Sequence, residues 1–276
     1  MNIRDLLPSF GSTVDNIDIR TLSDSERAEL KKALNERGVL VIREQLLSAA
    51  ELLEVGRKFG PVEYTVRGDF QHPDVPDVYV ISNIVEDGKP LGNPNDGFAW
   101  HTDLSFLENP TAFTFLYAIE TPPVGANTEF ASTQVAYDRL PPAQQDEFDH
   151  IRVRHSYEML HATRRNAAPL SAEELQRMPD VIHPLVRTHP DTARKALYLG
   201  LNTSLPVGMD PEEGQKLIED LMARTTINGP VYSHEWQPGD LVIWDNRLML
   251  HRATDYDKKA YRRLMYRVTV KGERPF

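Results

Sequence analysis

The chain has 276 residues, of which 40% are hydrophobic and 26% are charged, so it holds enough apolar material for a sizeable globular core. Its formal net charge of -10 disfavours binding to nucleic acid or to an anionic membrane surface. Because the chain has no cysteine, disulfides, thiolate metal ligands and a thiol nucleophile are excluded. Any metal must therefore be bound by nitrogen and oxygen.

The first residues, MNIRDLLPSFGSTVDNID, contain no basic segment followed by an apolar run, and nowhere do about eighteen apolar residues follow one another. We therefore expect a cytoplasmic protein that does not span a membrane. The chain also has no fixed-period repeat, low-complexity tract or long polar linker. Residues 1–276 are accordingly expected to form a single domain.

Two helices are predicted near the N-terminus, each opened by a capping box in which a serine and a glutamate three residues later each satisfy a backbone N–H of the other. Ser23 and Glu26 precede RAELKKALNERG, and Ser48 and Glu51 precede LLEVGRKFG. The intervening segment GVLVIRE is predicted to be a strand.

From residue 77 onward, short runs of β-branched and aromatic residues alternate with Pro, Gly, Asn and Asp, which is typical of strands. These runs are DVYVIS, TAFTFLYAIE, TEFAS, HPLVRTH, ALYLG, DLVIWDN and RRLMYRVTV. Two helical segments interrupt them. They are TQVAYDRLPPAQQDEFDH, broken by its Pro pair, and DPEEGQKLIEDLMART, with Asp210 as cap, Pro211 in the first turn and Glu213 completing a capping box.

The helical segments do not alternate with strands as often as a parallel α/β sheet requires. The pattern therefore predicts a mainly β protein with flanking helices, folded as a double-stranded β-helix of the jelly-roll, cupin-like type.

The segment WHTDLSF, residues 100–106, is predicted to be a buried strand that carries His101 and Asp103. Residues i and i+2 of a strand point to the same face, so both side chains would reach a single ion. The alternative is a hydrogen-bonded histidine beside a surface aspartate. His251 then supplies a third ligand after the apolar strand DLVIWDN. Two histidines and one carboxylate on a jelly roll are the facial triad of non-heme Fe(II) oxygenases, which leaves positions open for a chelating 2-oxo acid and for dioxygen.

The strand RRLMYRVTV places Arg263, Met265 and Arg267 on one face by strand alternation. If that face is the interior, each guanidinium requires an anion, and a carboxylate or sulfonate is the natural bidentate partner. The alternative is a solvated edge strand that carries arginine for solubility.

The other histidines have no ligand partner at strand spacing, and most are expected at the surface or behind the site: His72, His150, His155, His161, His183, His189 and His234.

The segments WHTDLSF, GANTEF, HPLVRTH, GDLVIWDNRLMLHRA and RRLMYRVTV resemble, in order and spacing, the taurine/2,4-D dioxygenase family of Fe(II)- and 2-oxoglutarate-dependent oxygenases. The resemblance runs from GVLVIRE to KGERP. It implies that iron is bound by His101, Asp103 and His251. It also implies that the distal carboxylate of 2-oxoglutarate is held by Thr128 and Arg263, and that Arg267 meets the negative group of the substrate. Trp244 and Asn246 resemble positions that shape the site from behind the ligands.

The resemblance implies that 2-oxoglutarate and O2 are converted to succinate and carbon dioxide while a C–H bond of a second substrate is oxidised. Hydroxylation is the expected outcome, followed by cleavage where the new hydroxyl lies beside a heteroatom. Because Asp103 fills the position that chloride would need, halogenation is disfavoured.

The sequence departs from the pattern of taurine enzymes, since Thr65 and Gly68 stand nearest to their His and Tyr, and Gly97 stands in place of their Asn. EYTVRGDFQHPDVPDVYVISN and EDGKPLGNP resemble enzymes that oxidise N-carboxymethyl amino acids to isonitriles, whereas LVRTHPDTARKALYLG resembles aryloxyalkanoate enzymes. In both cases Tyr64 and Arg267 are expected to position a carboxylate. A small anionic organic acid, such as an aryloxyalkanoate or N-substituted amino acid, is therefore expected rather than taurine.

Three alternatives stand beside this function. They are isonitrile-forming oxidative decarboxylation by the same iron chemistry, a hydrolase in which a metal such as zinc activates water, and a non-catalytic jelly-roll binding protein. Thr128 and Arg263 discriminate the oxygenase from the last two alternatives, because a metal site without 2-oxoglutarate does not require either residue. The resemblance also makes a homo-oligomer, a dimer or a tetramer, an expectation.

Overall fold

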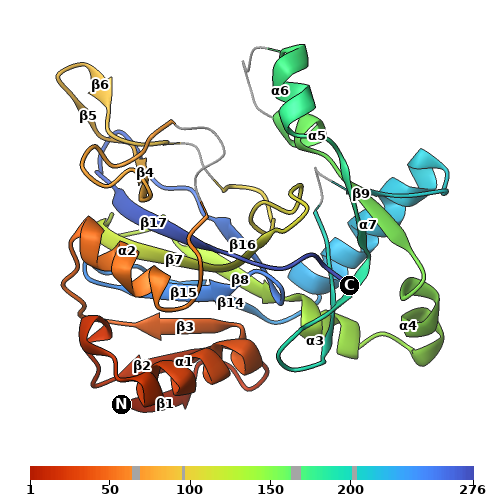
Figure 1. Ribbon diagram of the computed structural model, residues 1–276, viewed down its shortest axis with the longest axis horizontal. Helices are drawn as coiled ribbons and strands as arrows, with labels where there is room; N and C mark the ends of the chain where they lie inside the picture. Colours follow the sequence, from red (N-terminus) through yellow and green to blue (C-terminus); the bar gives the residue numbers. More distant parts are fainter. Residues whose placement is uncertain (64–68, 95–96, 163–168, 201–203) are drawn as a thin grey trace.

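Two β-sheets packed face to face form the body of the molecule in the computed structural model, which describes residues 1–63, 69–94, 97–162, 169–200 and 204–276 (Figure 1). In the larger sheet, β2 and β3 are parallel and the other described neighbours are antiparallel. Its strands, in spatial order, are β1 (Asn2–Asp5), β2 (Ser12–Asp15), β3 (Val39–Ile42), β15 (Leu241–Asp245), β7 (Thr111–Glu120), β17 (Leu264–Lys271) and β4 (Tyr79–Ser82).

The smaller sheet is antiparallel and consists of β14 (Val231–His234), β8 (Thr128–Ser132) and β16 (Met249–Ala253). Buried residues from the inner faces of the two sheets share one core, for example Leu116 of β7, Phe130 of β8 and Met249 of β16. Alternation along each strand sends these apolar side chains inward. This arrangement is a jelly roll, so the predicted fold is confirmed.

Two helices cover the outer face of the larger sheet, α1 (Asp24–Arg37) and α2 (Ala49–Arg57). Each begins with the capping box predicted from the sequence. Leu34 of α1 and Leu52 of α2 are fully buried and belong to the same core cluster as Phe115, which points outward from β7. The sheet is therefore packed on both faces.

The remaining elements surround the two sheets. A three-stranded sheet contains β10 (Val181–Pro184), β9 (Arg152–His155) and β13 (Ser204–Pro206), and two pairs are β11 (Val186–Thr188) with β12 (Lys195–Leu197) and β5 (Val85–Glu86) with β6 (Lys89–Pro90). The other described helices are η1 (Ile19–Thr21), a 3-10 helix, α3 (Thr133–Asp138), α4 (Pro142–Phe148), α5 (Tyr157–Ala162), α6 (Ala172–Arg177) and α7 (Pro211–Thr226).

The helical predictions over 133–150 and 210–225 are confirmed, with one difference in detail. The first segment is divided near its Pro pair into α3 and α4. Asp210 caps α7 by accepting hydrogen bonds from the backbone N–H groups of Glu212 and Glu213. This is the part of the predicted capping box in which the cap side chain accepts.

The prediction of one strand over HPLVRTH is wrong, because the chain forms two strands there. The segment up to Pro184 pairs with β9, whereas the segment from Val186 pairs with β12. Residues such as Leu185 separate two ladders with different partners, and a run of β-forming residues does not reveal such a change of partner.

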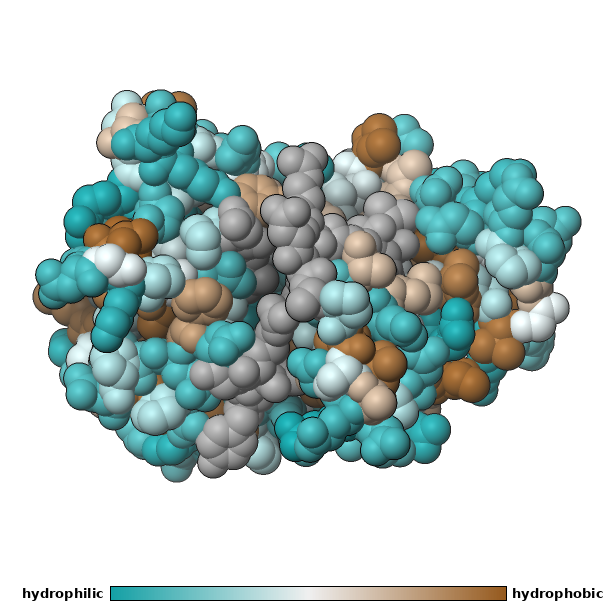
Figure 2. All heavy atoms as spheres, turned by 90° about the horizontal axis from the view of Figure 1, so that it is seen from above, coloured by the Kyte–Doolittle hydropathy of each residue, from teal (hydrophilic) through white to brown (hydrophobic). Residues whose placement is uncertain are grey.

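The surface seen from above is mostly hydrophilic, with hydrophobic side chains in small separate groups (Figure 2). This distribution agrees with the net charge of -10. Among the described helices, none combines the length and the apolar character needed to cross a bilayer.

His155 of β9 makes the stability of the fold sensitive to pH. Its ring is fully buried against those of His183 and Tyr198, and neither ring nitrogen has a hydrogen-bond partner among the described residues. Burial, aided by the neighbouring His183, lowers the pKa of His155 from 6.5 to about 3. His155 therefore binds a proton in the unfolded chain at pH values where it stays unprotonated in the folded chain. Stability is lost as the pH falls from about 6.5 towards 3.

Between pH 7 and pH 5.5, we expect the free energy of unfolding to fall by about 1 kcal/mol less in His155→Phe than in the wild type. Urea unfolding at both pH values for both proteins checks this. Because His183 and His234 are retained in the variant, the difference isolates His155. Equal losses in the two proteins would contradict the assignment.

Candidate active site

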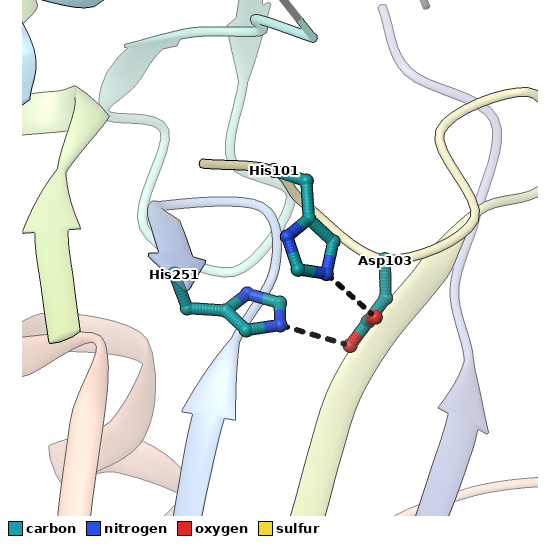
Figure 3. Close-up of side chains that lie close together, drawn as sticks. All are labelled: His101, Asp103 and His251. Carbon is teal, nitrogen blue, oxygen red and sulfur yellow. Dashed lines mark ion pairs between the residues drawn. The ribbon is translucent and has the colours of Figure 1, made fainter. Parts of the chain in front are cut away.

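A backbone bridge brings His101 and His251 together. His251 lies in β16, and each residue donates its N–H to the carbonyl of the other, at 3.0 and 2.9 Å. His101 Nε2 is 3.8 Å from Oδ1 of Asp103, and His251 Nε2 is 3.8 Å from Oδ2 (Figure 3). Ligand atoms of the three residues all lie within 4.8 Å of one another. The three predicted ligands therefore surround one common point.

The prediction that WHTDLSF is a strand is wrong beyond His101. Only the bridge to His251 is β-structure, and Asp103 begins a turn in which Leu104 has a φ of 52°. The turn places the Asp103 carboxylate against the two imidazoles without the strand alternation that suggested it. Thr102 Oγ1 donates to the carbonyl of Asn246 at 2.7 Å, so the chain is anchored to the turn after β15 instead of to a strand.

The tautomer of His101 makes its Nε2 available as a metal ligand. Its Nδ1 lies 2.7 Å from the carbonyl oxygen of Ala99, and because a carbonyl only accepts, Nδ1 carries the proton. Nε2 therefore directs a lone pair towards the Asp103 carboxylate. A cation bound between these two electron-rich atoms would stabilise both of them. Two imidazole nitrogens and one carboxylate are the donor set that suits Fe(II) with open coordination positions.

The surroundings of the triad favour the protonation states that bind a metal. Burial opposes the charge on Asp103, but its electrostatic interactions with His251 and Arg267, together with the hydrogen bond from Thr114, outweigh burial and lower the pKa of Asp103 to about 2. Burial lowers the pKa of His251 to about 3, and repulsion from His101 acts in the same direction. Near neutral pH the site thus offers a carboxylate and an unprotonated imidazole.

Asn246 fixes the carboxylate ligand through a buried hydrogen-bond network. Its Oδ1 accepts from the Asp103 backbone N–H at 3.1 Å and from Trp244 Nε1 at 3.0 Å, while its Nδ2 donates to Thr114 Oγ1 at 2.9 Å. The Thr114 hydroxyl then donates to Asp103 Oδ2 at 2.6 Å. Because every bond has a defined direction, the network specifies one orientation of the Asp103 side chain.

A cavity beside the triad contains both predicted anion-binding arginines. Arg263 precedes β17 and Arg267 lies within it, whereas Met265 between them belongs to the core between the sheets. The predicted alternation is therefore confirmed, and β17 is not an edge strand because it lies between β7 and β4. The cavity is lined by Ile81, Gly97, His101, Leu116, Thr128, Trp244, His251, Ala253, Arg263 and Arg267.

Arg267 lies between the metal ligands and an aromatic ring. Its Nη1 is 3.9 Å from Asp103 Oδ1, and its guanidinium carbon is 4.5 Å from the centre of the Tyr79 ring. The Tyr79 hydroxyl accepts a hydrogen bond from Asn93 at 3.0 Å, so the ring beneath the guanidinium is itself held. Stacking on an aromatic face and a nearby carboxylate both favour the charged guanidinium.

Gly97 borders the cavity at the position where the taurine pattern has Asn. Its φ is +78°, its carbonyl accepts from the Ala253 N–H at 2.7 Å, and an added Cβ would lie 3.4 Å from Cε1 of His101. A residue with a side chain would have a strained backbone at this position, and its Cβ would contact the His101 ring. Tyr64, the other predicted substrate residue, lies outside the described residues.

Several residues that support the site carry no motif. Thr114 is an inward polar residue in an apolar strand, which is a usable but weak signal. The expectation that most other histidines lie at the surface or behind the site is wrong for several of them, because His155, His183 and His189 are buried elsewhere in the fold. His234 is also buried, and its neighbour Trp236 contacts Thr128 of the cavity.

Comparisons with known proteins agree with this geometry. The family model described as "Taurine catabolism dioxygenase TauD, TfdA family" matches residues 2–269. The chain is 35% identical to an alpha-ketoglutarate-dependent 2,4-dichlorophenoxyacetate dioxygenase of Cupriavidus pinatubonensis, over 96% of each chain. It is 32% identical to pentalenolactone F synthase of Streptomyces arenae, over 90% of this chain and 88% of that protein.

A solved structure supports the same relationship. The crystal structure of AAD-2 in complex with Mn(II) and N-oxalylglycine superposes with a TM-score of 0.85 and 32% identity, over 99% of this chain and 98% of that chain. The jelly roll and its His-Asp-His site thus define a non-heme Fe(II), 2-oxoglutarate-dependent dioxygenase. The chain belongs to the TauD/TfdA family. The family relationship therefore does not support the two alternatives of a hydrolase and a non-catalytic binding protein.

We expect Thr114→Val to weaken metal binding about tenfold, because the Asp103 carboxylate loses the hydroxyl that orients it. Anaerobic titration with Mn(II), followed by the loss of the free-ion electron paramagnetic resonance signal, measures the dissociation constant. Thr269→Val is the matched control, since Thr269 pairs with Thr114 in the sheet but donates to the Glu63 carbonyl. Wild-type affinity in Thr114→Val would show that the network does not tune the metal site.

Proposed function

We propose that His101, Asp103 and His251 bind Fe(II), that Thr128 and Arg263 bind the distal carboxylate of 2-oxoglutarate, and that Arg267 binds the carboxylate of a small organic acid. The observation that carries the proposal is the presence of two arginines in the cavity that also contains two of the metal ligands. Burying a guanidinium costs several kcal/mol unless an anion compensates. Arg263 is buried just before β17, and Arg267 lies within β17 beside Asp103, so the cavity offers cationic groups to anionic ligands beside the metal.

Arg263 and Thr128 bind the cosubstrate, and Arg267 orients the substrate. Arg263 is buried and its planar guanidinium matches a carboxylate with two parallel hydrogen bonds. Thr128 lines the same cavity from the opposite sheet, so the two groups would hold one carboxylate between them. Fe(II), when bound, supplies dioxygen activation coupled to the conversion of 2-oxoglutarate to succinate and carbon dioxide, and the oxidation of a C–H bond. The protein positions that bond through Arg267.

The cavity favours a substrate with a carboxylate and an apolar body. Ile81 and Leu116 contribute apolar surface beside Arg267, and Gly97 removes the amide that the taurine pattern places there. An aryloxyalkanoate fits this description, and a relative named for 2,4-dichlorophenoxyacetate supports the choice. Hydroxylation of the carbon between its carboxylate and its ether oxygen would give a hemiacetal that breaks down, so cleavage would follow oxidation.

N-oxalylglycine supports the assignment of the cosubstrate pocket. It has the oxalyl group and the distal carboxylate of 2-oxoglutarate, with N–H in place of one methylene, and AAD-2 is described in complex with it and Mn(II). We also propose that residues 1–276 act as one catalytic domain, because the family model matches most of that length.

The two arginines should separate in a spectroscopic test. With Fe(II) and 2-oxoglutarate under anaerobic conditions, we expect a weak visible charge-transfer band in the wild type and a shift of that band with phenoxyacetate. Arg263→Met should raise the dissociation constant for 2-oxoglutarate roughly 100-fold, because a charged hydrogen-bonding partner is lost. Arg267→Met should keep the band but lose the shift.

Arg262→Met provides the matched control. Arg262 is the neighbour of Arg263 but is exposed and paired with Glu120, so both the band and the shift should persist. The panel of added compounds includes taurine and an N-carboxymethyl amino acid, which test the other substrate classes. If Arg267→Met responded to phenoxyacetate as the wild type does, the assignment of Arg267 to the substrate would be wrong.

A further inference from the structure

The hydroxyl of Thr128 has one defined partner inside the protein. Trp236 Nε1 lies 3.0 Å from Thr128 Oγ1, and both side chains are buried. Among the described residues, Trp236 is the hydrogen-bond partner of Thr128 Oγ1. Thr128 is the first residue of β8, and its side chain lines the cavity beside the metal ligands.

The chemistry of the two groups gives this contact a direction. An indole N–H can donate a hydrogen bond but cannot accept one, whereas a hydroxyl can do both. Trp236 therefore occupies an acceptor position of Thr128 Oγ1. The hydroxyl proton is then directed away from the indole, and the cavity is the side left for an acceptor. A carboxylate in the cavity is such an acceptor, and a cation is not.

Trp236 is held in place by a second polar chain. The ring of His234 meets the Trp236 ring edge-on, with 4.5 Å between centroids and an angle of 87°. His234 Nε2 lies 3.0 Å from Asp240 Oδ2, which also accepts from Arg43 Nη1 at 2.7 Å. Because the carboxylate accepts, Nε2 carries the proton of the His234 ring. Tyr232 then donates its hydroxyl proton to Nδ1 at 2.9 Å.

The position of His234 ties this chain to Thr128. In the sheet, His234 of β14 is the register partner of Thr128 of β8. The backbone ladder and the side-chain contacts thus set the distance between the indole and the hydroxyl together. Burial lowers the pKa of His234, which favours the neutral ring and the fixed tautomer.

We propose that Trp236 is a positioning residue for the cosubstrate, because its indole N–H orients the Thr128 hydroxyl as a hydrogen-bond donor towards the distal carboxylate of 2-oxoglutarate. This inference rests on the proposed role of Thr128 and Arg263. It assigns to Trp236 selectivity between 2-oxo acids with and without a distal carboxylate, and it assigns no role in metal binding.

The test compares two ligands that share the metal-chelating end. 2-Oxoglutarate carries the distal carboxylate, and 2-oxopentanoate lacks it. Dissociation constants for both are measured anaerobically with Fe(II) from the charge-transfer band, and Mn(II) affinity is measured alone. Trp236→Phe removes the N–H and keeps an aromatic ring, and Thr128→Val removes the hydroxyl and keeps the shape.

We expect Thr128→Val to raise the dissociation constant for 2-oxoglutarate about 20-fold, because a hydrogen bond to an ionised carboxylate is lost, and Trp236→Phe to raise it about fivefold, because the hydroxyl remains but loses its fixed orientation. The constant for 2-oxopentanoate and the Mn(II) affinity should stay within about twofold of the wild type. In the double variant the effect should match that of Thr128→Val alone, because the indole acts only through the hydroxyl.

Trp100→Phe is the matched control, since the Trp100 ring contacts the Arg252 guanidinium and not Thr128, and its ratio of the two constants should equal that of the wild type. A wild-type ratio in Trp236→Phe with an altered ratio in Thr128→Val overturns the role of Trp236 and leaves the proposed function standing. A wild-type ratio in Trp236→Phe, Thr128→Val and Arg263→Met overturns the proposed carboxylate pocket itself. Equal weakening of both ligands by Trp236→Phe overturns the inference, because it indicates a general structural effect.

Discussion

The active site depends on the two backbone hydrogen bonds that join His101 to His251. They link the segment around His101 to a strand of the smaller sheet and hold the two imidazoles close together. Asp103 follows within two residues and is fixed from behind by Asn246 and Thr114. The geometry of the triad therefore depends on the backbone and on its buried polar network, which hold the two imidazoles and the carboxylate around one point.

A second constraint is electrostatic. The chain carries a net charge of -10, yet its central cavity contains Arg263 and Arg267. Within a buried site, charges interact much more strongly than at the solvated surface, so the local cations outweigh the distant surface carboxylates. An acidic protein can thus bind acidic ligands, provided that the cations lie inside and the anions outside.

The sequence predicted the sandwich, the helix caps, the grouping of His101, Asp103 and His251 and the inward face of β17, because each depends on local patterns or spacing. It failed where long-range contacts decide the structure. WHTDLSF is apolar enough for a strand, but Thr102 and Asp103 bond to Asn246, and the chain turns. Thr114 and Trp236 gave no strong signal, because their importance comes from partners 11 and 108 residues away.

The placement of Arg263 just before β17 and of Arg267 within it has a consequence for substrate size. A strand rises about 3.3 Å per residue, so Arg263 and Arg267 are separated by about 13 Å along it, or somewhat less across the bulge after Leu264. Under the proposed roles of Arg263 and Arg267, the segment that joins them sets the spacing between the cosubstrate carboxylate and the substrate carboxylate, whereas His251 of β16 and the turn at Asp103 set the position of the metal. A substrate is then measured by the distance from its carboxylate to the carbon that reacts. Lengthening the acid by one methylene would bring a different carbon to the metal.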